Sequence, residues 1–186
     1  MRFVKLAIIS FIVFFLLLTG ITSLFPSRVI VARAITLDAP KDSIAALIDN
    51  FSQWNRWMEG TRNTDYKVVA KDSTHAFFGT VMITLVSKKN NVWSYEWKTR
   101  TSLQKVTIQI TSAGTGSNVV TWTFEQHVKW YPWEKFGSMM NDKIIGSAIE
   151  KSLDNLKMIL QNNGNQVSVI SRSTSKTRSS SASVIQ

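Results

Sequence analysis

The hydrophobic pattern divides the chain into an apolar N-terminal run, a patterned middle and a polar C-terminal tail. Twenty-two residues between Lys5 and Arg28 carry no charge and read LAIISFIVFFLLLTGITSLFPS. A helix of that length is about 33 Å long, enough to cross a hydrocarbon core of about 30 Å. We therefore expect a single-pass membrane anchor over residues 1–27, with Leu6–Phe25 in the membrane.

A cleaved secretory signal is the competing interpretation, because Arg2 and Lys5 form a basic start ahead of the apolar run. The sequence that follows, TGITSLFPS, has no clear A-x-A-like cleavage site, which favours a retained anchor. Arg28 and Arg33 on the far side of the apolar run nearly balance Arg2 and Lys5. The distribution of basic residues therefore gives almost no indication of the membrane orientation. A non-cytoplasmic domain is favoured only because so short a head usually stays in the cytoplasm.

The middle of the chain alternates polar and apolar residues at the period of β-strands. Residues 28–37, RVIVARAITL, predict one strand, and D-A-P ends it. Further strands are predicted over 65–130, most clearly in VTIQI and VVTWTFEQHVKW, with turns at 71–73, 89–91, 100–102 and 113–117. Such short connections predict an antiparallel meander. The pattern leaves open whether 74–87 is one strand or two bent at Gly79.

Helical spacing flanks the predicted strands. A short amphipathic helix is predicted after Pro40, and a second one from Gln53 to Met58. Residues 133–160 keep the 3–4 spacing of apolar residues over about seven turns, which predicts one long C-terminal helix. Gly137 and Gly146 each weaken that helix by about 1 kcal/mol relative to Ala. They indicate a bend or a close backbone approach.

This order of elements resembles the START-like superfamily, also called the polyketide cyclase/dehydrase (SRPBCC) or Bet v 1-like group. RAITLDAPKDSIAALIDNFSQWNRW is similar to the family's opening strand, x-A-P turn and two helices. KWYPWEKFGSMMNDKIIGSAIEKSLDNLKMIL is similar to the closing helix of membrane-anchored members, with L-x-x-L-K at Leu153, Leu156 and Lys157. The resemblance covers about residues 28–161. It implies an α+β helix-grip fold, a curved antiparallel sheet wrapped around the C-terminal helix, here preceded by a transmembrane helix.

Charge and composition narrow the function classes. The formal charge of +10 comes largely from the two ends, and residues 29–164 hold sixteen Lys or Arg against twelve acids. These sixteen are scattered, so no nucleic-acid-binding face is expected. Residues 162–186 are rich in Ser, Thr, Asn and Gln and predict a disordered tail. Without cysteine, the chain cannot form a disulfide or a thiolate nucleophile.

The histidines are the first candidates for catalysis. On VVTWTFEQHVKW, the period-two pattern places Glu125 and His127 on the face opposite Trp122 and Phe124, so both are expected to face solvent. His75 is a weak catalytic candidate, because it shares the apolar face of Phe77 if the strand continues through Gly79. No metal-ligand cluster or phosphate loop occurs, so neither a metal nor a cofactor is expected.

The aromatic residues are more informative than the titratable ones. All seven tryptophans fall between positions 54 and 133, and WSYEWK places Trp93, Tyr95 and Trp97 on one face. A sheet curled around one helix often keeps an apolar pocket. The residues expected to line such a pocket are Trp57, Phe77, Trp93, Trp97, Trp122, Phe124, Phe136 and Met140.

The leading hypothesis is therefore a membrane-tethered START-like domain that binds a hydrophobic or lipid-like molecule without catalysis. The family label implies a different class, an enzyme that cyclises or dehydrates a polyketide-like substrate. A third alternative is a protein-interaction domain with a filled core. An enzyme needs an inward acid or base, for which the sequence offers His75 and acids such as Glu96 whose facing is open.

Overall fold

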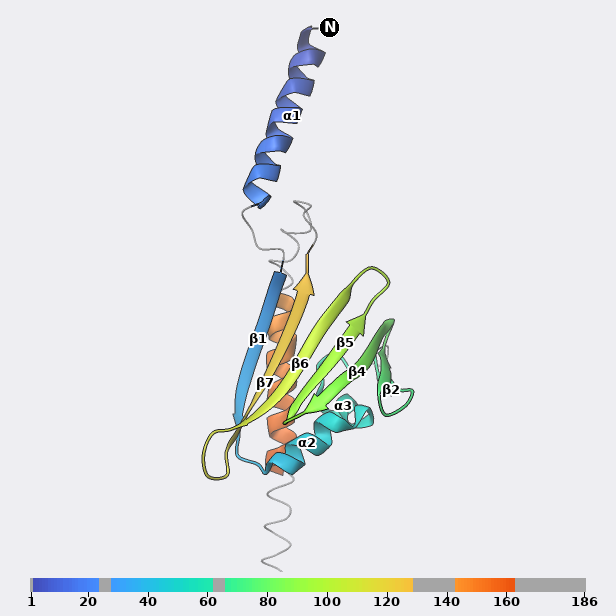
Figure 1. Ribbon diagram of the computed structural model, residues 1–186, viewed down its shortest axis with the longest axis vertical. Coiled ribbons are helices and arrows are strands. Elements are labelled where there is room, and N and C mark those ends of the chain that lie inside the picture. Colours follow the sequence, from blue (N-terminus) through green and yellow to red (C-terminus); the bar gives the residue numbers. More distant parts are fainter. Residues whose placement is uncertain (1, 24–27, 62–65, 129–142, 163–186) are drawn as a thin grey trace, which may run out of the picture.

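The computed structural model describes residues 2–23, 28–61, 66–128 and 143–162, which form an N-terminal helix and a sheet-and-helix domain (Figure 1). The domain contains one 7-stranded sheet in the order β1-β7-β6-β5-β4-β3-β2, and every neighbouring pair is antiparallel. The strands are β1 (Arg28–Leu37), β2 (Val68–Ala70), β3 (His75–Phe78), β4 (Val81–Lys89), β5 (Val92–Lys98), β6 (Leu103–Ser112) and β7 (Asn118–His127).

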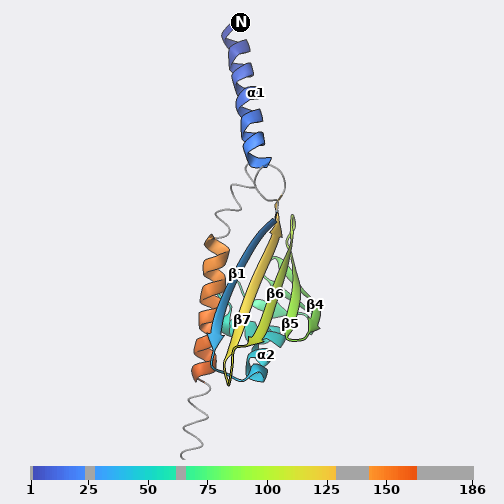
Figure 2. The same cartoon turned by 60° about the vertical axis from the view of Figure 1, so that its left-hand side comes forward.

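A long C-terminal helix, described over residues 143–162, runs along one face of the curved sheet (Figures 1 and 2). Two short helices, α2 (Lys41–Asp49) and α3 (Phe51–Trp57), pack against the same sheet. The core between them contains side chains from every layer, including Ile48 of α2, Trp54 of α3, Val106 of β6 and Leu156 of the C-terminal helix. This is the α+β helix-grip architecture that the sequence predicts.

Alternating side chains build the sheet, as expected from the period-two pattern. On β7, Val120, Trp122 and Phe124 are buried against the helix, whereas Glu125 and His127 lie on the other side. The predicted turn between β4 and β5 is a tight hairpin in which Asn90 and Asn91 both have positive φ angles, 52° and 61°. Asn is one of the few residues that tolerate this conformation, so the turn residues set the strand pairing.

The segment around Gly79 is two strands and not one. β3 and β4 pair as an antiparallel hairpin, with Phe78 opposite Val81 and Ala76 opposite Ile83. Gly79 occupies the first turn position with φ +58°, a conformation that favours glycine. Because side chains of paired residues point to the same side, the inward positions change from even numbers on β3 to odd numbers on β4. The face predicted for a continuous strand is therefore wrong for β3.

The two short helices are fixed by caps and by indole hydrogen bonds. The side chain of Asn50 accepts a hydrogen bond from the Ser52 N–H at the start of α3. Trp54 and Trp57 of α3 donate their indole N–H groups to the α2 backbone, to the carbonyl oxygens of Ile48 at 2.8 Å and Leu47 at 3.2 Å. These buried, satisfied donors lock α3 against α2.

An arginine of the edge strand β1 links that strand to the C-terminal helix. Arg33 of β1 donates a hydrogen bond from Nε to Glu150 at 2.6 Å. A Cβ at Gly146, one turn earlier, would lie 2.5 Å from the Nη2 atom of Arg33. The glycine therefore leaves room for the guanidinium, which confirms the close approach expected at Gly146. The predicted helix start at 133–142, including Gly137, lies outside the described residues. Of the predicted tail, 162–186, residue 162 is still helical, and the rest lies outside the described residues.

Helix α1 (Arg2–Ser23) extends away from the domain beyond the Arg28 end of β1 (Figure 1). Its span Phe3–Ile21 is long and apolar enough to cross a membrane, and none of that span is buried against the protein. An N-terminal signal sequence would satisfy the same test. The apolar helix itself is thus confirmed.

Candidate ligand pocket

A pocket of ≈ 320 Å³ lies between the inner face of the sheet and the C-terminal helix. Its walls are mostly apolar and come from the turn after α3, from strands β3 to β7 and from the first described turns of the C-terminal helix. The lining residues are Met58, Glu59, Phe78, Val81, Trp97, Thr99, Gln104, Trp122, Phe124, Ile144, Ile145, Ala148, Ile149 and Ser152.

Three of the eight predicted lining residues, Trp97, Trp122 and Phe124, meet in this pocket. Trp97 stands edge-on to both partners, with ring centroids 6.5 Å from Trp122 and 6.3 Å from Phe124. Phe78, which the sequence analysis missed, adds a fourth ring 6.4 Å from Trp97. The four rings make one wall of the pocket, and the helix residues from Ile144 to Ser152 make the opposite wall.

Two predicted residues belong to the core behind the pocket. Trp57 packs edge-on against Trp122, with centroids 5.5 Å apart, and is itself fully buried. Trp93 donates its indole N–H to Asp49 at 2.7 Å, beneath α2. Both residues face inward as predicted, but neither lines the pocket.

The prediction that Phe77 faces inward is wrong. It is 39% exposed, because its neighbours Ala76 and Phe78 occupy the inner face of β3. The cause is the tight hairpin at Gly79, because the inward-facing positions have even numbers before it and odd numbers after it. The two remaining predicted lining residues, Phe136 and Met140, lie outside the described residues.

The indole N–H groups of Trp97 and Trp122 are the unusual polar atoms of the pocket. Both nitrogen atoms are buried, and within the described part of the chain neither has a hydrogen-bond partner. Trp122 as a whole is 3% exposed. A buried donor without an acceptor costs about 1–3 kcal/mol. Both indole N–H groups are enclosed within the packed wall and are not open to the pocket.

The remaining polar side chains of the wall are engaged by the protein. The hydroxyl of Ser152 donates to the Ala148 carbonyl at 2.6 Å and accepts from the Glu59 N–H at 2.8 Å. Thr99 donates to the Ser102 carbonyl at 3.1 Å. Gln104 donates to the Ser102 hydroxyl at 3.3 Å. These groups shape the wall and leave the two indoles as its unsatisfied donors among the described residues.

Glu59 is the one titratable residue among the described lining residues of this pocket. Its Oε1 atom lies 3.9 Å from the Nζ atom of Lys151, at the edge of the ion-pair range. The sequence pattern does not indicate Glu59, because this residue lies in the turn after α3, where no period shows which way a side chain faces. Any acid–base chemistry among the described lining residues would have to use this carboxyl group.

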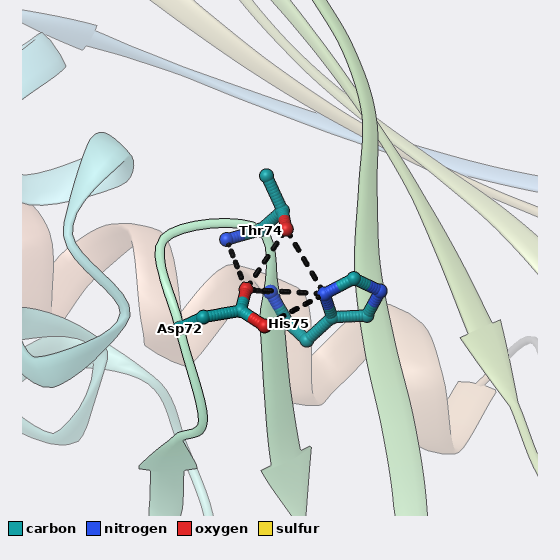
Figure 3. Close-up of polar contacts among 3 residues, drawn as sticks. All are labelled: Asp72, Thr74 and His75. Carbon is teal, nitrogen blue, oxygen red and sulfur yellow. Dashed lines mark hydrogen bonds and ion pairs between the residues drawn. The ribbon is translucent and has the colours of Figure 1, made fainter.

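His75, the weak catalytic candidate, lies away from the pocket in an exposed cluster at the β2–β3 turn. Figure 3 shows its ring facing the side chains of Asp72 and Thr74. The Asp72 oxygen atoms lie 3.0 Å from His75 Nδ1, and the Thr74 hydroxyl lies 2.9 Å from the same nitrogen. A catalytic triad needs the acid and the nucleophile on opposite ring nitrogens, so this cluster is not one.

The cluster instead stabilises the turn. Asp72 accepts hydrogen bonds from the backbone N–H groups of Thr74 and His75, each at 2.7 Å. The bonds from the Thr74 backbone and hydroxyl hold the pKa of Asp72 well below its usual range, with a smaller contribution from His75. An inward-facing His75 was predicted on the condition that the strand continues through Gly79, and the β3–β4 hairpin removes that condition.

The fold also shows where the titratable side chains of Glu125, His127 and Tyr95 lie. Glu125 and His127 face outward as predicted, and Glu125 pairs with Arg28 Nε at 3.0 Å. Burial raises the pKa of Tyr95, and the charge of Asp49 raises it further. Tyr95 is held in the core, where its hydroxyl donates to the Ile48 carbonyl at 3.4 Å.

A second pocket of ≈ 760 Å³ lies at the opposite end of the domain, between α2, α3 and the end of the C-terminal helix. Most of its lining side chains are small or polar. They are Asp38, Ala39, Pro40, Ser43, Ala46, Leu47, Asn50, Gln53, Arg56 and Leu160. None of the predicted site residues lies there, and it offers an apolar molecule less apolar contact than the helix–sheet pocket.

Comparison with known proteins agrees with the fold. A family model described as polyketide cyclase / dehydrase and lipid transport matches residues 28–161. No curated protein matches the sequence.

Solved structures with the same fold are distant in sequence. Norcoclaurine synthase from Thalictrum flavum, in complex with dopamine and hydroxybenzaldehyde, aligns with a TM-score of 0.56 at 11% identity, covering 73% of this chain and 87% of that one. A START superfamily protein from Mycobacterium smegmatis aligns at 0.52 and 14% identity, covering 72% and 97%. CalU16 from Micromonospora echinospora aligns at 0.52 and 13%, covering 71% and 81%. At such identities they show the fold alone. Through its matched domain, the chain belongs to the polyketide cyclase/dehydrase and lipid transport family.

Proposed function

We propose that this protein is a membrane-tethered binding protein that holds an apolar or lipid-like small molecule in the helix–sheet pocket. The observation that carries the proposal is the pocket itself, ≈ 320 Å³ between an aromatic wall and an aliphatic helix face. A guest gains about 25 cal/mol for each Å² of apolar surface that it removes from water. The volume lies at the lower end of small-molecule sites, which suits a guest of modest size.

The position of the pocket supports a link to the membrane. Residues 24–27 join α1 to β1, so the first residue of β1 lies within about 18 Å of the end of α1. The pocket occupies this same end of the sheet, because its residues Phe78, Val81 and Thr99 flank the β3–β4 and β5–β6 turns that lie toward Arg28. A retained α1 would hold the pocket end of the domain close to the bilayer, where apolar molecules are concentrated.

We favour a retained anchor with the domain on the non-cytoplasmic side. No residue in the apolar span of α1 is buried against the protein, as expected for a helix whose partner is lipid. The short N-terminal head carries Arg2 and Lys5, and short basic segments tend to stay in the cytoplasm. The partners of the protein are then the membrane and a small apolar guest.

An enzyme of the cyclase type is the second candidate, and the presence of Glu59 in the pocket is the observation that favours it. Binding alone is preferred, because Glu59 is the one acid or base among the described lining residues and its neighbour Lys151 competes for it. A filled-core interaction domain is disfavoured by the volume of the pocket.

The experiment is native mass spectrometry of the full-length protein, extracted from cells in copolymer nanodiscs without detergent. We expect a protein peak with one bound apolar molecule that survives removal of the disc lipids. Incubation should return the guest unchanged. Recovery of a chemically altered guest, lost in Glu59→Gln, would instead support the enzyme, and a protein that is always empty would support the interaction domain.

A further inference from the structure

We propose that the domain itself contacts the lipid bilayer, through a band of apolar and basic side chains on the outer face of the sheet at the end nearest α1. This proposal deepens the proposed function and rests on a retained α1, which brings that end of the domain to the membrane. The outer face is the one that points away from the C-terminal helix (Figure 2).

The last row of side chains on the outer face lies beside the β3–β4 and β5–β6 turns. Paired residues point to the same side of a sheet, so the strand register shows which side chains lie next to one another. The register of β6 and β7 places Leu103 level with His127. Taken across the sheet from β2 to β1, this end row consists of Val69, Phe77, Met82, Lys98, Leu103, His127 and Arg28.

The apolar side chains of the end row are open to solvent. Val69 is 60% exposed, Leu103 48% and Phe77 39%. Tyr66, at the β3–β4 turn, is also exposed, and its ring packs against Phe78 with centroids 6.1 Å apart. Neighbouring exposed apolar residues are typical of a surface that meets a partner or a membrane. Tyrosine is among the residues enriched where protein crosses the membrane–water interface.

The polar side chains of the end row are basic, and the row contains no Asp or Glu. Lys98 in the row and Arg100 in the adjacent β5–β6 turn form no ion pair with any described residue. Arg28 pairs with Glu125, which belongs to the next row. That next row alternates in charge across β5, β6 and β7, with Glu96, Lys105 and Glu125. The acidic side chains of the outer face therefore begin one row behind the apolar band.

A bilayer with anionic headgroups fits this combination better than a second copy of the chain. Basic side chains are attracted to such headgroups, whereas a two-fold contact between copies would bring two positively charged patches together. The end row also lies at the end of the domain that residues 24–27 join to α1. A tether raises the effective concentration of the domain at the membrane, so a weak contact is sufficient. Docking would hold the pocket, which lies behind the same turns, against the lipid.

The chain contains no cysteine, so a single Leu103→Cys substitution can carry an environment-sensitive fluorescent label. Gln109→Cys is the matched control, because it is exposed on the same face of β6 about 20 Å further from the end row. The full-length protein is placed in nanodiscs of phosphatidylcholine and phosphatidylglycerol that include lipids with a nitroxide quencher near the headgroup. We expect blue-shifted emission and nitroxide quenching of the label on β6 at position 103, and neither at position 109.

Two pairs of substitutions in the protein labelled at position 103 test the apolar and the basic parts of the surface. Val69→Asp should remove most of the quenching, whereas Val86→Asp should retain it, because Val86 is 58% exposed but lies nearer the β4–β5 hairpin. Lys98→Gln should lower the ratio of docked to undocked domains about fivefold in anionic discs, which corresponds to about 1 kcal/mol. Lys89→Gln, the same change at the β4–β5 hairpin, should leave that ratio unchanged.

The outcomes separate docking from anchoring. Labels that are equally open to water at both positions, in discs that retain α1, would overturn the inference and leave the anchor and the ligand pocket intact. A blue shift at position 103 without nitroxide quenching would show that a protein surface covers the end row, and it would overturn the inference too. Failure of the chain to remain in the discs would count against the proposed anchor as well.

Discussion

At the scale of residues, tryptophan serves two purposes in this domain. One tryptophan anchors the core through a hydrogen bond from its indole N–H, and another lines the pocket. Trp93 and Trp97 lie on one face of β5 as the alternation predicts, yet Trp93 is tied to Asp49 whereas Trp97 borders the pocket. The period of the sequence indicates that both face inward. It cannot indicate which has an acceptor, because Asp49 is supplied by α2 through tertiary packing. Glu59 could not be predicted either, because the turn in which it lies has no period that shows which way its side chain faces.

The Asp72 cluster gives a pH prediction at this scale. Hydrogen bonds from Thr74 hold the pKa of Asp72 below its usual range. A carboxylate with a lowered folded-state pKa stabilises the fold above the unfolded pKa of about 4, and the contribution is lost as the pH falls toward the folded pKa. Asp72→Asn should therefore lower the free energy of unfolding at pH 7, by an amount that shrinks below pH 4. Urea unfolding across this range measures it, and a difference that stays constant with pH would contradict the assignment.

At the scale of elements, the sequence predicts most of the sheet and helices because period and turn residues agree. β1, α2, β6 and β7 fall where expected, and Asn90 and Asn91 mark their hairpin correctly. The β3–β4 hairpin is the instructive exception. A two-residue turn at Gly79 reverses the chain without interrupting the apolar run. A continuous strand and a hairpin therefore have the same sequence pattern here. That ambiguity placed Phe77 and His75 on the wrong side.

The contact between β1 and the C-terminal helix gives a prediction for elements. Alanine is favoured over glycine in a helix by about 1 kcal/mol, but a Cβ at Gly146 would press on Arg33. Gly146→Ala should therefore stabilise the protein by about 1 kcal/mol in an Arg33→Ala background and by clearly less in the wild type. A double-mutant cycle of unfolding free energies measures the coupling. Additive effects would mean that the guanidinium does not occupy the space over Gly146.

At the scale of the whole molecule, the tether and the pocket share one end of the domain. The order of elements in the sequence predicts an anchor followed by a helix-grip domain, but not this alignment. It follows from the three-dimensional register, in which the β5–β6 turn meets the same sheet end as Arg28 and His127. The fold was thus predictable in outline, whereas the location of the pocket along the helix depended on the packed structure.

Membrane topology can be tested because the chain contains no cysteine. A single Ser87→Cys substitution, at an exposed position on β4, provides one reactive thiol. In intact cells we expect a membrane-impermeant maleimide to label it, and the labelled full-length protein to remain in membranes after alkaline carbonate washing. Labelling only after lysis would place the domain in the cytoplasm. A soluble product beginning after residue 20 would show that α1 is a cleaved signal.

The central claim is that the helix–sheet pocket holds the guest, and one pair of variants tests it most directly. Ala148 lines the pocket, whereas its neighbour Ser147 is exposed on the outer side of the same helix. Ala148→Phe should fill the cavity and abolish the co-purified guest in native mass spectra, while Ser147→Phe, which adds the same ring outside, should retain it. Unfolding midpoints of both variants confirm that each is folded. A guest that persists at full occupancy in folded Ala148→Phe would contradict the account.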